Sequence, residues 1–208
     1  MIAGIVLAAG RSSRLGRPKQ LLPLGGEPLL RHTLRPILAS SLDEVLVVIG
    51  HEAEAVRAVI ADLPIRIVLN PDYALGQSTS VFAGIRALTP NTEAAMFLLG
   101  DQPGIAPATI DALIQAWRET HAPVAVPSYT DGFGNPVLFD RRVFPDLTSL
   151  EGDRGANPIV RSYRQRGQLA SVPVASPAPS DVDTEEDYAA LLAATKSPSP
   201  TAVGEGLG

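Results

Sequence analysis

The chain has 208 residues, of which 45% are hydrophobic and 19% charged, and it carries a formal net charge of −5. This length and hydrophobic content suffice for one folded domain with its own core, whereas the negative charge disfavours a nucleic-acid-binding surface. The absence of cysteine excludes disulfides, thiolate catalysis and cysteine-ligated metals. With no apolar run near twenty residues and no secretory leader, we expect a cytoplasmic protein whose partners include neither nucleic acid nor membrane.

Short β-branched runs alternate along the chain with longer segments of helical apolar spacing. The predicted strands are Ile2–Ala8, Glu44–Ile49, Ile65–Leu69, Ala95–Leu99 and Val124–Val126, with Pro136–Asp140 and Leu169–Val174 as extra or antiparallel strands near one edge. The predicted helices are Pro28–Ala39, Ala53–Ala61, Ser78–Leu88, Pro107–Glu119, Arg154–Arg166 and Thr184–Ala194. The pattern predicts one α/β domain over residues 1–195, with a mostly parallel sheet between two helical layers in a Rossmann-like, three-layer α/β/α arrangement. Residues 196–208, rich in Ser, Pro and Gly, are predicted to form a disordered tail.

The first predicted strand leads into a basic loop of small residues. Its sequence is Leu7-Ala8-Ala9-Gly10-Arg11-Ser12-Ser13-Arg14-Leu15-Gly16-Arg17-Pro18-Lys19, and its four cations all precede the first acidic residue of the chain, Glu27. Small residues let backbone N–H groups approach phosphate oxygens, and the cations add positive charge. The chain has only two lysines, of which Lys19 is one, but fifteen arginines. The use of lysine in the loop indicates that this position requires a compact ammonium group. The loop therefore predicts a triphosphate site, with a solvated turn as the alternative, while its spacing excludes the Walker and dinucleotide motifs.

Two acidic positions follow predicted strands or precede a predicted helix near the same edge of the sheet. Asp101 follows Gly100 at the end of the predicted strand Ala95–Leu99, where ligands collect in an open α/β sheet. A carboxylate there suits Mg²⁺, which binds few protein carboxylates and keeps phosphate oxygens and water as its other ligands. A role in a turn or a helix cap is the alternative for Asp101. A second ligand is expected from Asp181 or Asp183, although Asp183 also has the spacing of a helix cap with Glu186 three residues later.

Recognition of the nucleobase is expected from backbone groups and small side chains. The residues concerned are Ala8, Ala9, Asn70, Gln77 and Ser78. The segment Gly76–Ser80 also brings N–H groups and hydroxyls to a predicted helix start, where they can hold ribose or phosphate. Ordinary helix capping explains the same residues equally well.

The basic loop and its continuation, Pro18-Lys19-Gln20-Leu21-Leu22-Pro23-Leu24, resemble the nucleotidyltransferases that activate sugars, isoprenoid precursors and molybdopterin. Within that MobA-like NTP transferase superfamily, the chain is most similar to the molybdenum cofactor cytidylyltransferases, which the triplet Asp101-Gln102-Pro103 and the terminal Asp183-Thr184 pair also match. The resemblance implies a nucleotide-diphospho-sugar transferase-like fold, CTP as a substrate, and Mg²⁺, replaceable by Mn²⁺, on Asp101 and Asp183. Ala9 favours CTP because related guanylyltransferases carry glycine there.

Together, the loop and the resemblance assign roles to individual residues. The catalytic residues are expected to be Arg14, Lys19 and Asp101. The nucleotide-binding residues are expected to be Leu7, Ala8, Ala9, Gly10, Arg11, Ser12, Ser13, Arg14, Lys19, Asn70, Gln77, Ser78 and Asp101. The residues of the second-substrate site, in segments similar to the pterin-binding half of the family's site, are expected to be Gln102, Pro103, Asn135, Pro136, Gly152, Asp153 and Gly155.

The reaction that the resemblance implies is attack by the terminal phosphate of molybdopterin, or of the molybdenum cofactor, on the α-phosphorus of CTP. Pyrophosphate leaves and no protein nucleophile is required. Three alternatives remain open: a nucleotidyltransferase that uses GTP or a sugar or alditol phosphate, an NAD(P)H-dependent reductase, and a non-catalytic chaperone that delivers the cofactor. A molybdenum hydroxylase apoenzyme is the expected recipient in the last case and a candidate partner in the others.

Overall fold

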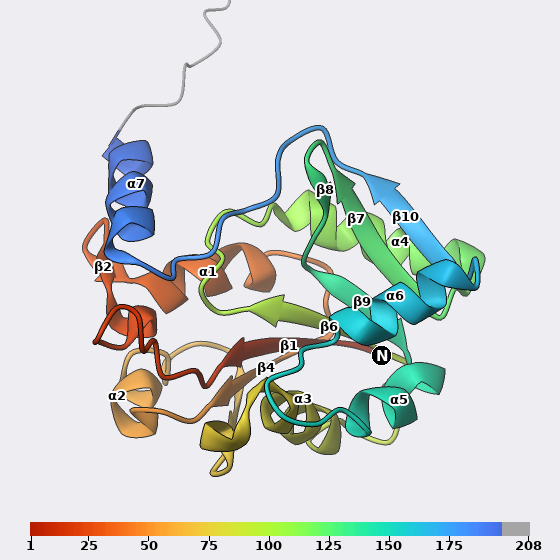
Figure 1. Cartoon of the computed structure of the whole chain (residues 1–208), viewed down its shortest axis with the longest axis horizontal. Coiled ribbons are helices and arrows are strands. Elements are labelled where there is room, and N and C mark those ends of the chain that lie inside the picture. The colour runs from red at the N-terminus through yellow and green to blue at the C-terminus, as the bar shows by residue number, and fades with distance from the viewer. Residues whose placement is uncertain (197–208) are drawn as a thin grey trace, which may run out of the picture.

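In the computed structural model, which describes residues 1–196, an eight-stranded sheet lies between two layers of helices (Figure 1). The strands of the sheet are β1 (Ile2–Ala8), β4 (Glu44–Ile49), β5 (Arg66–Leu69), β6 (Ala94–Leu99), β7 (Val124–Tyr129), β8 (Gly132–Phe133), β9 (Val137–Asp140) and β10 (Leu169–Pro173). Their order is β10-β7-β9-β6-β1-β4-β5, with β8 paired to β7. A separate small hairpin is formed by β2 (Pro23–Leu24) and β3 (Glu27–Pro28).

The helices of the described residues are α1 (Leu29–Leu38), α2 (Ala53–Ala58), α3 (Gln77–Arg86), α4 (Pro107–Thr120), α5 (Phe144–Thr148), α6 (Asn157–Gln165) and α7 (Glu185–Lys196). All of them except α7 cover one of the two faces of the sheet, and α7 lies beside the β2 hairpin (Figure 1). Three short 3₁₀ turns are η1 (Lys19–Leu21), η2 (Tyr73–Leu75) and η3 (Arg141–Val143). Side chains of α1, α2 and α4 form one core with the sheet, and side chains of α3, α5 and α6 form the other. This arrangement confirms the expected three-layer α/β fold.

Strand β1 lies at the centre of the sheet, between β4 and β6, and runs parallel to both. Its near-continuous apolar sequence fits a strand that is covered on both faces. Helix α3 packs closely on this strand because residue 84 is a glycine: a Cβ atom there would lie 2.6 Å from Cγ2 of Ile5. The parallel pairing brings the carboxyl ends of β1, β4, β5 and β6 to one edge, as predicted.

The structure differs from the prediction in the position of one strand and in the bounds of two helices. The predicted strand at 136–140 was expected near an edge, but β9 lies between β6 and β7 and is antiparallel to both, while β10 forms the edge parallel to β7. The helix expected from residue 154 begins at Asn157, followed by Pro158 in its first turn, where proline is favoured. Helix α7 continues to Lys196, so the predicted tail does not begin there. Residues 197–208, the rest of the predicted tail, lie outside the described residues.

None of the helices in residues 1–196 combines the length and the apolar character that crossing a bilayer requires.

Candidate functional site

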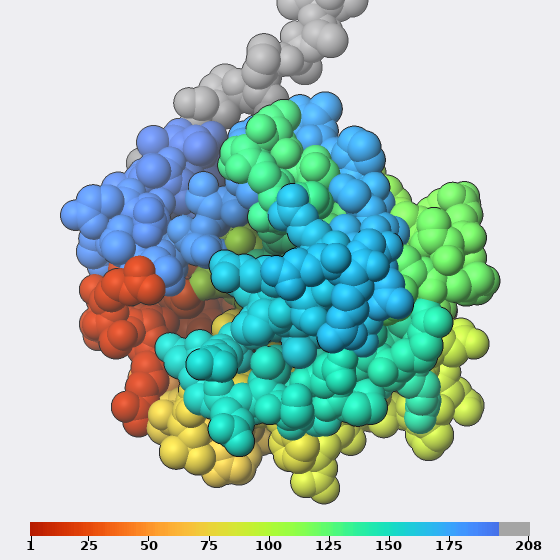
Figure 2. All heavy atoms as spheres, turned by 45° about the vertical axis from the view of Figure 1, so that its right-hand side comes forward, coloured from red at the N-terminus to blue at the C-terminus, as the bar shows by residue number. Residues whose placement is uncertain are grey.

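A cavity of about 610 Å³ opens at the carboxyl ends of β1 and β6. Figure 2 shows this hollow between the red N-terminal loop, the blue segment that leads into α7 and the teal stretch near residue 150. Its wall is formed by Leu7, Ala9, Gly10, Arg11, Ser12, Ser13, Arg14, Lys19, Gln20, Tyr73, Ala74, Leu75, Gly76, Gln77, Ser80, Leu99, Gly100, Asp101, Asp153, Asp181 and Asp183. In this site the basic loop therefore meets Asp101, which follows the end of β6, and the segment before α7.

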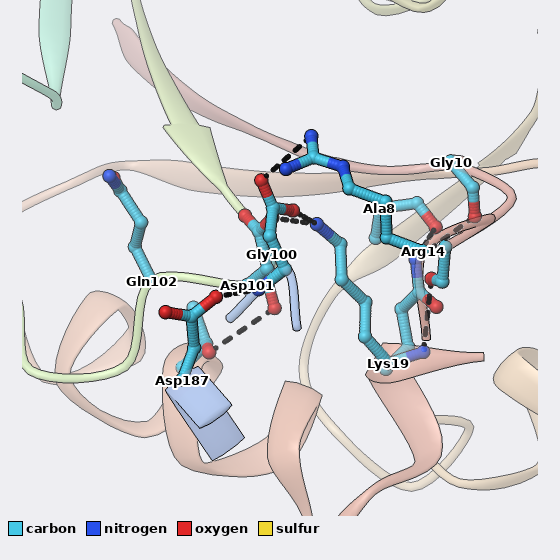
Figure 3. A network of polar contacts seen from close by, with 12 residues as sticks. Ala8, Gly10, Arg14, Lys19, Gly100, Asp101, Gln102 and Asp187 are labelled. Atoms are coloured by element: carbon cyan, nitrogen blue, oxygen red, sulfur yellow. Dashed lines mark hydrogen bonds and ion pairs between the residues drawn. The ribbon is translucent and has the colours of Figure 1, made fainter. Parts of the chain in front are cut away.

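At the floor of the cavity, Lys19 connects two carboxylates that are far apart in the sequence. Its Nζ donates hydrogen bonds to Oδ2 of Asp101 and, at 2.9 Å, to Oδ1 of Asp183. The Lys19 and Asp101 side chains are only 14% and 15% exposed, so their ion pair is largely removed from solvent. Figure 3 shows Lys19 reaching toward Asp101 with Arg14 nearby, and Arg14 Nη2 lies 3.1 Å from Oδ2 of Asp183.

The backbone fixes this meeting of segments. The amide N–H of Val182 donates to the carbonyl oxygen of Asp101 at 3.1 Å, which ties the chain before α7 to the end of β6. Thr184 and Asp187 cap α7: the N–H of Asp187 donates to Thr184 Oγ1, and Asp187 Oδ2 accepts from the N–H of Thr184. The cap predicted for Asp183 and Glu186 is therefore wrong, and the Asp183 carboxylate is left to face Lys19 and Arg14.

The charges at the site reinforce one another. Burial lowers the pKa of Lys19, but attraction to Asp101 and hydrogen bonds to Asp101 and Asp183 outweigh it, so the net pKa is raised. The hydrogen bond from Lys19 holds the pKa of Asp183 below its usual value. Burial, followed by the nearby charge of Asp101, raises the pKa of Asp181. The shifts of the Lys19 and Asp183 pKa values thus both favour the charged forms of the two side chains.

The pair of carboxylates suits a divalent cation. Asp101 and Asp183 already hold one cation between them, the ammonium of Lys19, so oxygens of the two carboxylates converge on one point. In the part of the chain that the structure describes, no group of three or more His, Asp or Glu side chains is placed to hold a metal. Two carboxylates are sufficient for Mg²⁺ when phosphate oxygens and water complete its six ligands. The residues present therefore fit the predicted metal, provided that a phosphorylated ligand shares it.

The basic loop offers hydrogen-bond donors to such a ligand. Backbone N–H groups of residues 10–14 have no hydrogen-bond acceptor within residues 1–196. Ser12 adopts a left-handed backbone with φ of 53°, and its hydroxyl accepts from the N–H of Lys19 at 3.1 Å, which closes the loop on itself. Unpaired amides beside the cavity wall form the anion-binding arrangement that the sequence predicts.

Arg17 belongs to the same loop but is directed elsewhere. Its guanidinium donates three hydrogen bonds of 2.9 to 3.2 Å to the carboxylate of Glu185 and lies 5.6 Å from the ring centre of Tyr188 on α7. The side chain is 50% exposed and forms no part of the cavity wall.

The amino-terminal end of α3 is covered by the segment predicted to bind the second substrate. The N–H of Gln77 donates to Oδ1 of Asp153 at 3.3 Å, and the N–H of Ser78 donates to the carbonyl oxygen of Gly152 at 3.2 Å. Gly76, with φ of 119°, permits this contact, because a Cβ atom there would lie 2.4 Å from the backbone of Gly152. These two amides therefore act in helix capping, the alternative raised by the sequence.

The structure does not bring every predicted site residue into the cavity. Asn70 and Ser78 are buried and line a second cavity of about 510 Å³, where Asn70 Nδ2 donates to the hydroxyls of Thr79 and Ser80. Ala8 is buried behind the loop. Of the predicted second-substrate residues, Asp153 lines the main cavity. The ones outside its wall are Gln102, Pro103, Asn135, Pro136, Gly152 and Gly155.

The cavity also contains residues that the sequence did not single out. The missed wall residues are Gln20, Tyr73, Ala74, Leu75 and Leu99. Tyr73 adds an aromatic wall, and the Arg11 guanidinium lies 5.6 Å from its ring centre. A signal for Gln20 was present, because it stands inside the motif that carries the family resemblance.

Comparison with known proteins finds similarity along most of the chain. The family described as the MobA-like NTP transferase domain matches residues 4–169. Nicotine blue oxidoreductase of Paenarthrobacter nicotinovorans is 34% identical over 198 residues, covering 92% of this chain and 96% of that protein. Purine catabolism protein PucB of Bacillus subtilis (strain 168) is 33% identical over 199 residues, covering 90% and 94%. The crystal structure of Rv0371C in complex with manganese, from Mycobacterium tuberculosis H37Rv, has a TM-score of 0.81 and 35% identity, covering 92% of this chain and 98% of that chain.

Proposed function

The chain belongs to the MobA-like NTP transferase family and is a nucleotidyltransferase, and we propose that it transfers CMP from CTP to the terminal phosphate of molybdopterin or of the molybdenum cofactor. The observation that carries the transferase chemistry is the placement of Lys19 between Asp101 and Asp183, beside a loop with unpaired amides. This combination of donors and carboxylates matches a triphosphate with its divalent cation. The choice of CTP and of molybdopterin is supported by the motifs that resemble the cytidylyltransferases.

In this proposal, the protein positions two phosphorylated substrates and offsets their charge. The amides of residues 10–14, with Arg14 and Lys19, hold the β- and γ-phosphates, which become the leaving pyrophosphate. The attacking oxygen belongs to a phosphate that is already anionic, so no general base is needed. Mg²⁺ on Asp101 and Asp183, with Mn²⁺ able to replace it, would polarise the α-phosphate and neutralise developing charge. The manganese complex of the Mycobacterium tuberculosis relative supports a divalent cation in this family.

The partners follow from the same proposal. Molybdopterin or the molybdenum cofactor is the acceptor, and Asp153, at the rim of the cavity, is the predicted second-substrate residue best placed to face it. A molybdenum hydroxylase apoenzyme is a candidate recipient of the product. We also propose that the protein is located in the cytoplasm.

Pyrophosphate release tests the proposal directly. Purified protein is incubated with molybdopterin, Mg²⁺ and each of CTP, GTP, ATP and UTP in parallel. CTP is expected to be preferred by about tenfold or more, because a base site that pairs with the polar edge of cytosine leaves its own polar groups unpaired with other bases. A preference for GTP would overturn the CTP assignment and leave the transferase chemistry standing.

A second candidate, an oxidoreductase, is favoured by the name of the relative from Paenarthrobacter nicotinovorans. The same assay separates the two. If no nucleotide releases pyrophosphate in the presence of molybdopterin, and the protein instead oxidises NADH or NADPH with an organic electron acceptor, the oxidoreductase replaces the transferase.

Arg17→Ala is expected to leave turnover within about threefold of wild type, since an exposed ion pair outside the cavity contributes little. Loss of the pair with Glu185 should lower the free energy of unfolding by about 0.5 kcal/mol. Steady-state pyrophosphate release and thermal unfolding measure the two effects. A large loss of turnover would place Arg17 among the phosphate-binding cations.

A further inference from the structure

Gln20 is buried beneath the basic loop. Its side chain is 2% exposed and forms part of the main cavity wall. The Nε2 group donates to the carbonyl oxygen of Ala8 at 3.0 Å and to that of Gly10 at 3.5 Å, and Figure 3 shows both carbonyl groups engaged. The orientation of the amide follows from these contacts, because the reverse orientation would place Oε1 against two other acceptors.

One of these bonds orients a free amide of the loop, and a contact from His51 orients a second. In a trans peptide the C=O and the next N–H point in opposite directions. The carbonyl of Gly10 faces Gln20, so the N–H of Arg11 points away from it. The carbonyl of Ala9 accepts from the N–H of His51 at 3.2 Å, which similarly fixes the N–H of Gly10. The directions of two unpaired N–H groups, those of Gly10 and Arg11, are thus fixed by hydrogen bonds to the carbonyl groups of the same peptides.

The other end of the Gln20 amide does not serve stability. Its Oε1 is buried and has no hydrogen-bond partner within the described residues. A buried acceptor without a donor lowers stability, and an apolar side chain of the same length would avoid that cost. The unpartnered Oε1 therefore gives no reason for glutamine at this position, whereas the two carbonyl contacts made by Nε2 do.

We propose that Gln20 is a positioning residue for the phosphate loop: its amide holds the Ala8 and Gly10 carbonyls, so that the loop, with the N–H of Arg11 directed away from Gln20, is preset for the β- and γ-phosphates of the nucleotide. This inference rests on the proposed function only in requiring that the loop bind a phosphate chain. It is independent of the base and of the acceptor.

The variant Gln20→Met removes both donors and keeps an unbranched side chain of similar length. We expect its dissociation constants for inorganic pyrophosphate and CTP to rise about tenfold, with KM for CTP rising by the same factor and kcat little changed, because the same phosphate contacts serve the ground state and the transition state. Binding of CMP, which lacks the β- and γ-phosphates, should change less than twofold. Isothermal titration calorimetry gives the three constants, and the pyrophosphate assay gives the kinetic split.

Trp117→Phe is the matched control. It removes one half-buried hydrogen bond, the 3.0 Å contact from Trp117 Nε1 to Asp140 Oδ2, and Trp117 lies outside the cavity wall. Its melting temperature should fall while its affinity for pyrophosphate stays at the wild-type value. If Gln20→Met does not fold, Gln20→Asn, whose shorter amide cannot span both carbonyls, carries the same prediction.

The outcomes separate this inference from the proposed function. Wild-type affinity for pyrophosphate in a folded Gln20 variant would overturn the positioning role and leave the transferase untouched. Weakened pyrophosphate binding together with a preference for GTP, or for another acceptor, would support the positioning role and overturn the substrate assignment. If the wild-type protein itself bound neither pyrophosphate nor any of the four triphosphates, both would fall.

Discussion

Replacing Lys19 with alanine is expected to lower turnover by about 10²-fold or more, the usual effect of losing a preorganised charge that stabilises a transition state. The ammonium lies between Asp101 and Asp183 at the floor of the cavity, where solvent screening is weak because the side chain is 14% exposed. Its raised pKa, the result of attraction and hydrogen bonds to the two aspartates that outweigh burial, keeps it charged at neutral pH. The pyrophosphate leaving group of a triphosphate bound in this cavity would therefore lose its most buried cationic partner.

The fold should survive this substitution. Asp183 keeps the contact with Arg14, and the backbone N–H of residue 19 keeps its bond to the Ser12 hydroxyl. Circular dichroism and thermal unfolding check the folded state, and steady-state pyrophosphate release measures turnover. Arg17→Ala serves as the matched control, because it removes a cation from the same loop but outside the cavity. Near-normal turnover of Lys19→Ala would exclude the ammonium from the mechanism.

Features carried by contiguous residues could be predicted from the sequence. The strand Ile2–Ala8 has the bounds expected, since an apolar run with no interruption fits a strand covered on both faces. The basic loop follows it directly, and parallel pairing with β6 brings Asp101 to the same edge. Local order was therefore enough to predict that the basic loop and Asp101 lie at the same edge of the sheet.

Features that depend on distant contacts could not be predicted in the same way. The antiparallel insertion of β9 between β6 and β7 is set by pairing with both neighbours, and no local pattern specifies that position. The hairpin strand β8 has two residues, too few to show alternation. Gly152 and Asp153 cover the start of α3, although they lie about 75 residues later in the sequence. Glycine and aspartate in a turn do not indicate which distant segment they will contact.

The α7 cap shows why one residue pattern can mislead. Asp183 and Thr184 both have side chains suited to an N-cap, and Glu186 and Asp187 both follow at the correct spacing of three. The structure selects Thr184 and Asp187. Both pairs satisfy the capping pattern, and the ion pair of Asp183 with Lys19, a contact between distant residues, distinguishes them.

Asp101→Ala is expected to lower turnover by about 10²-fold or more, as is Asp101→Asn, because both remove the negative charge that faces Lys19 and the proposed cation. The fold should persist, since the bond that ties the chain before α7 to β6 uses the backbone oxygen of Asp101 and not its carboxylate. Lys19 would keep its 2.9 Å contact with Asp183. The Mg²⁺ concentration for half-maximal turnover should also rise, because one of two carboxylates is lost.

Asp181→Asn provides the comparison for this last prediction. Asp181 lines the same cavity, but burial and the charge of Asp101 raise its pKa, and it makes no ion pair with Lys19 within residues 1–196. Its substitution should therefore cost less turnover than that of Asp101 and leave the Mg²⁺ requirement near the wild-type value. Pyrophosphate release measured across a Mg²⁺ titration distinguishes the two positions. Equal losses in both variants would assign Asp181 to the cation site, and wild-type turnover in Asp101→Ala would remove Asp101 from the mechanism.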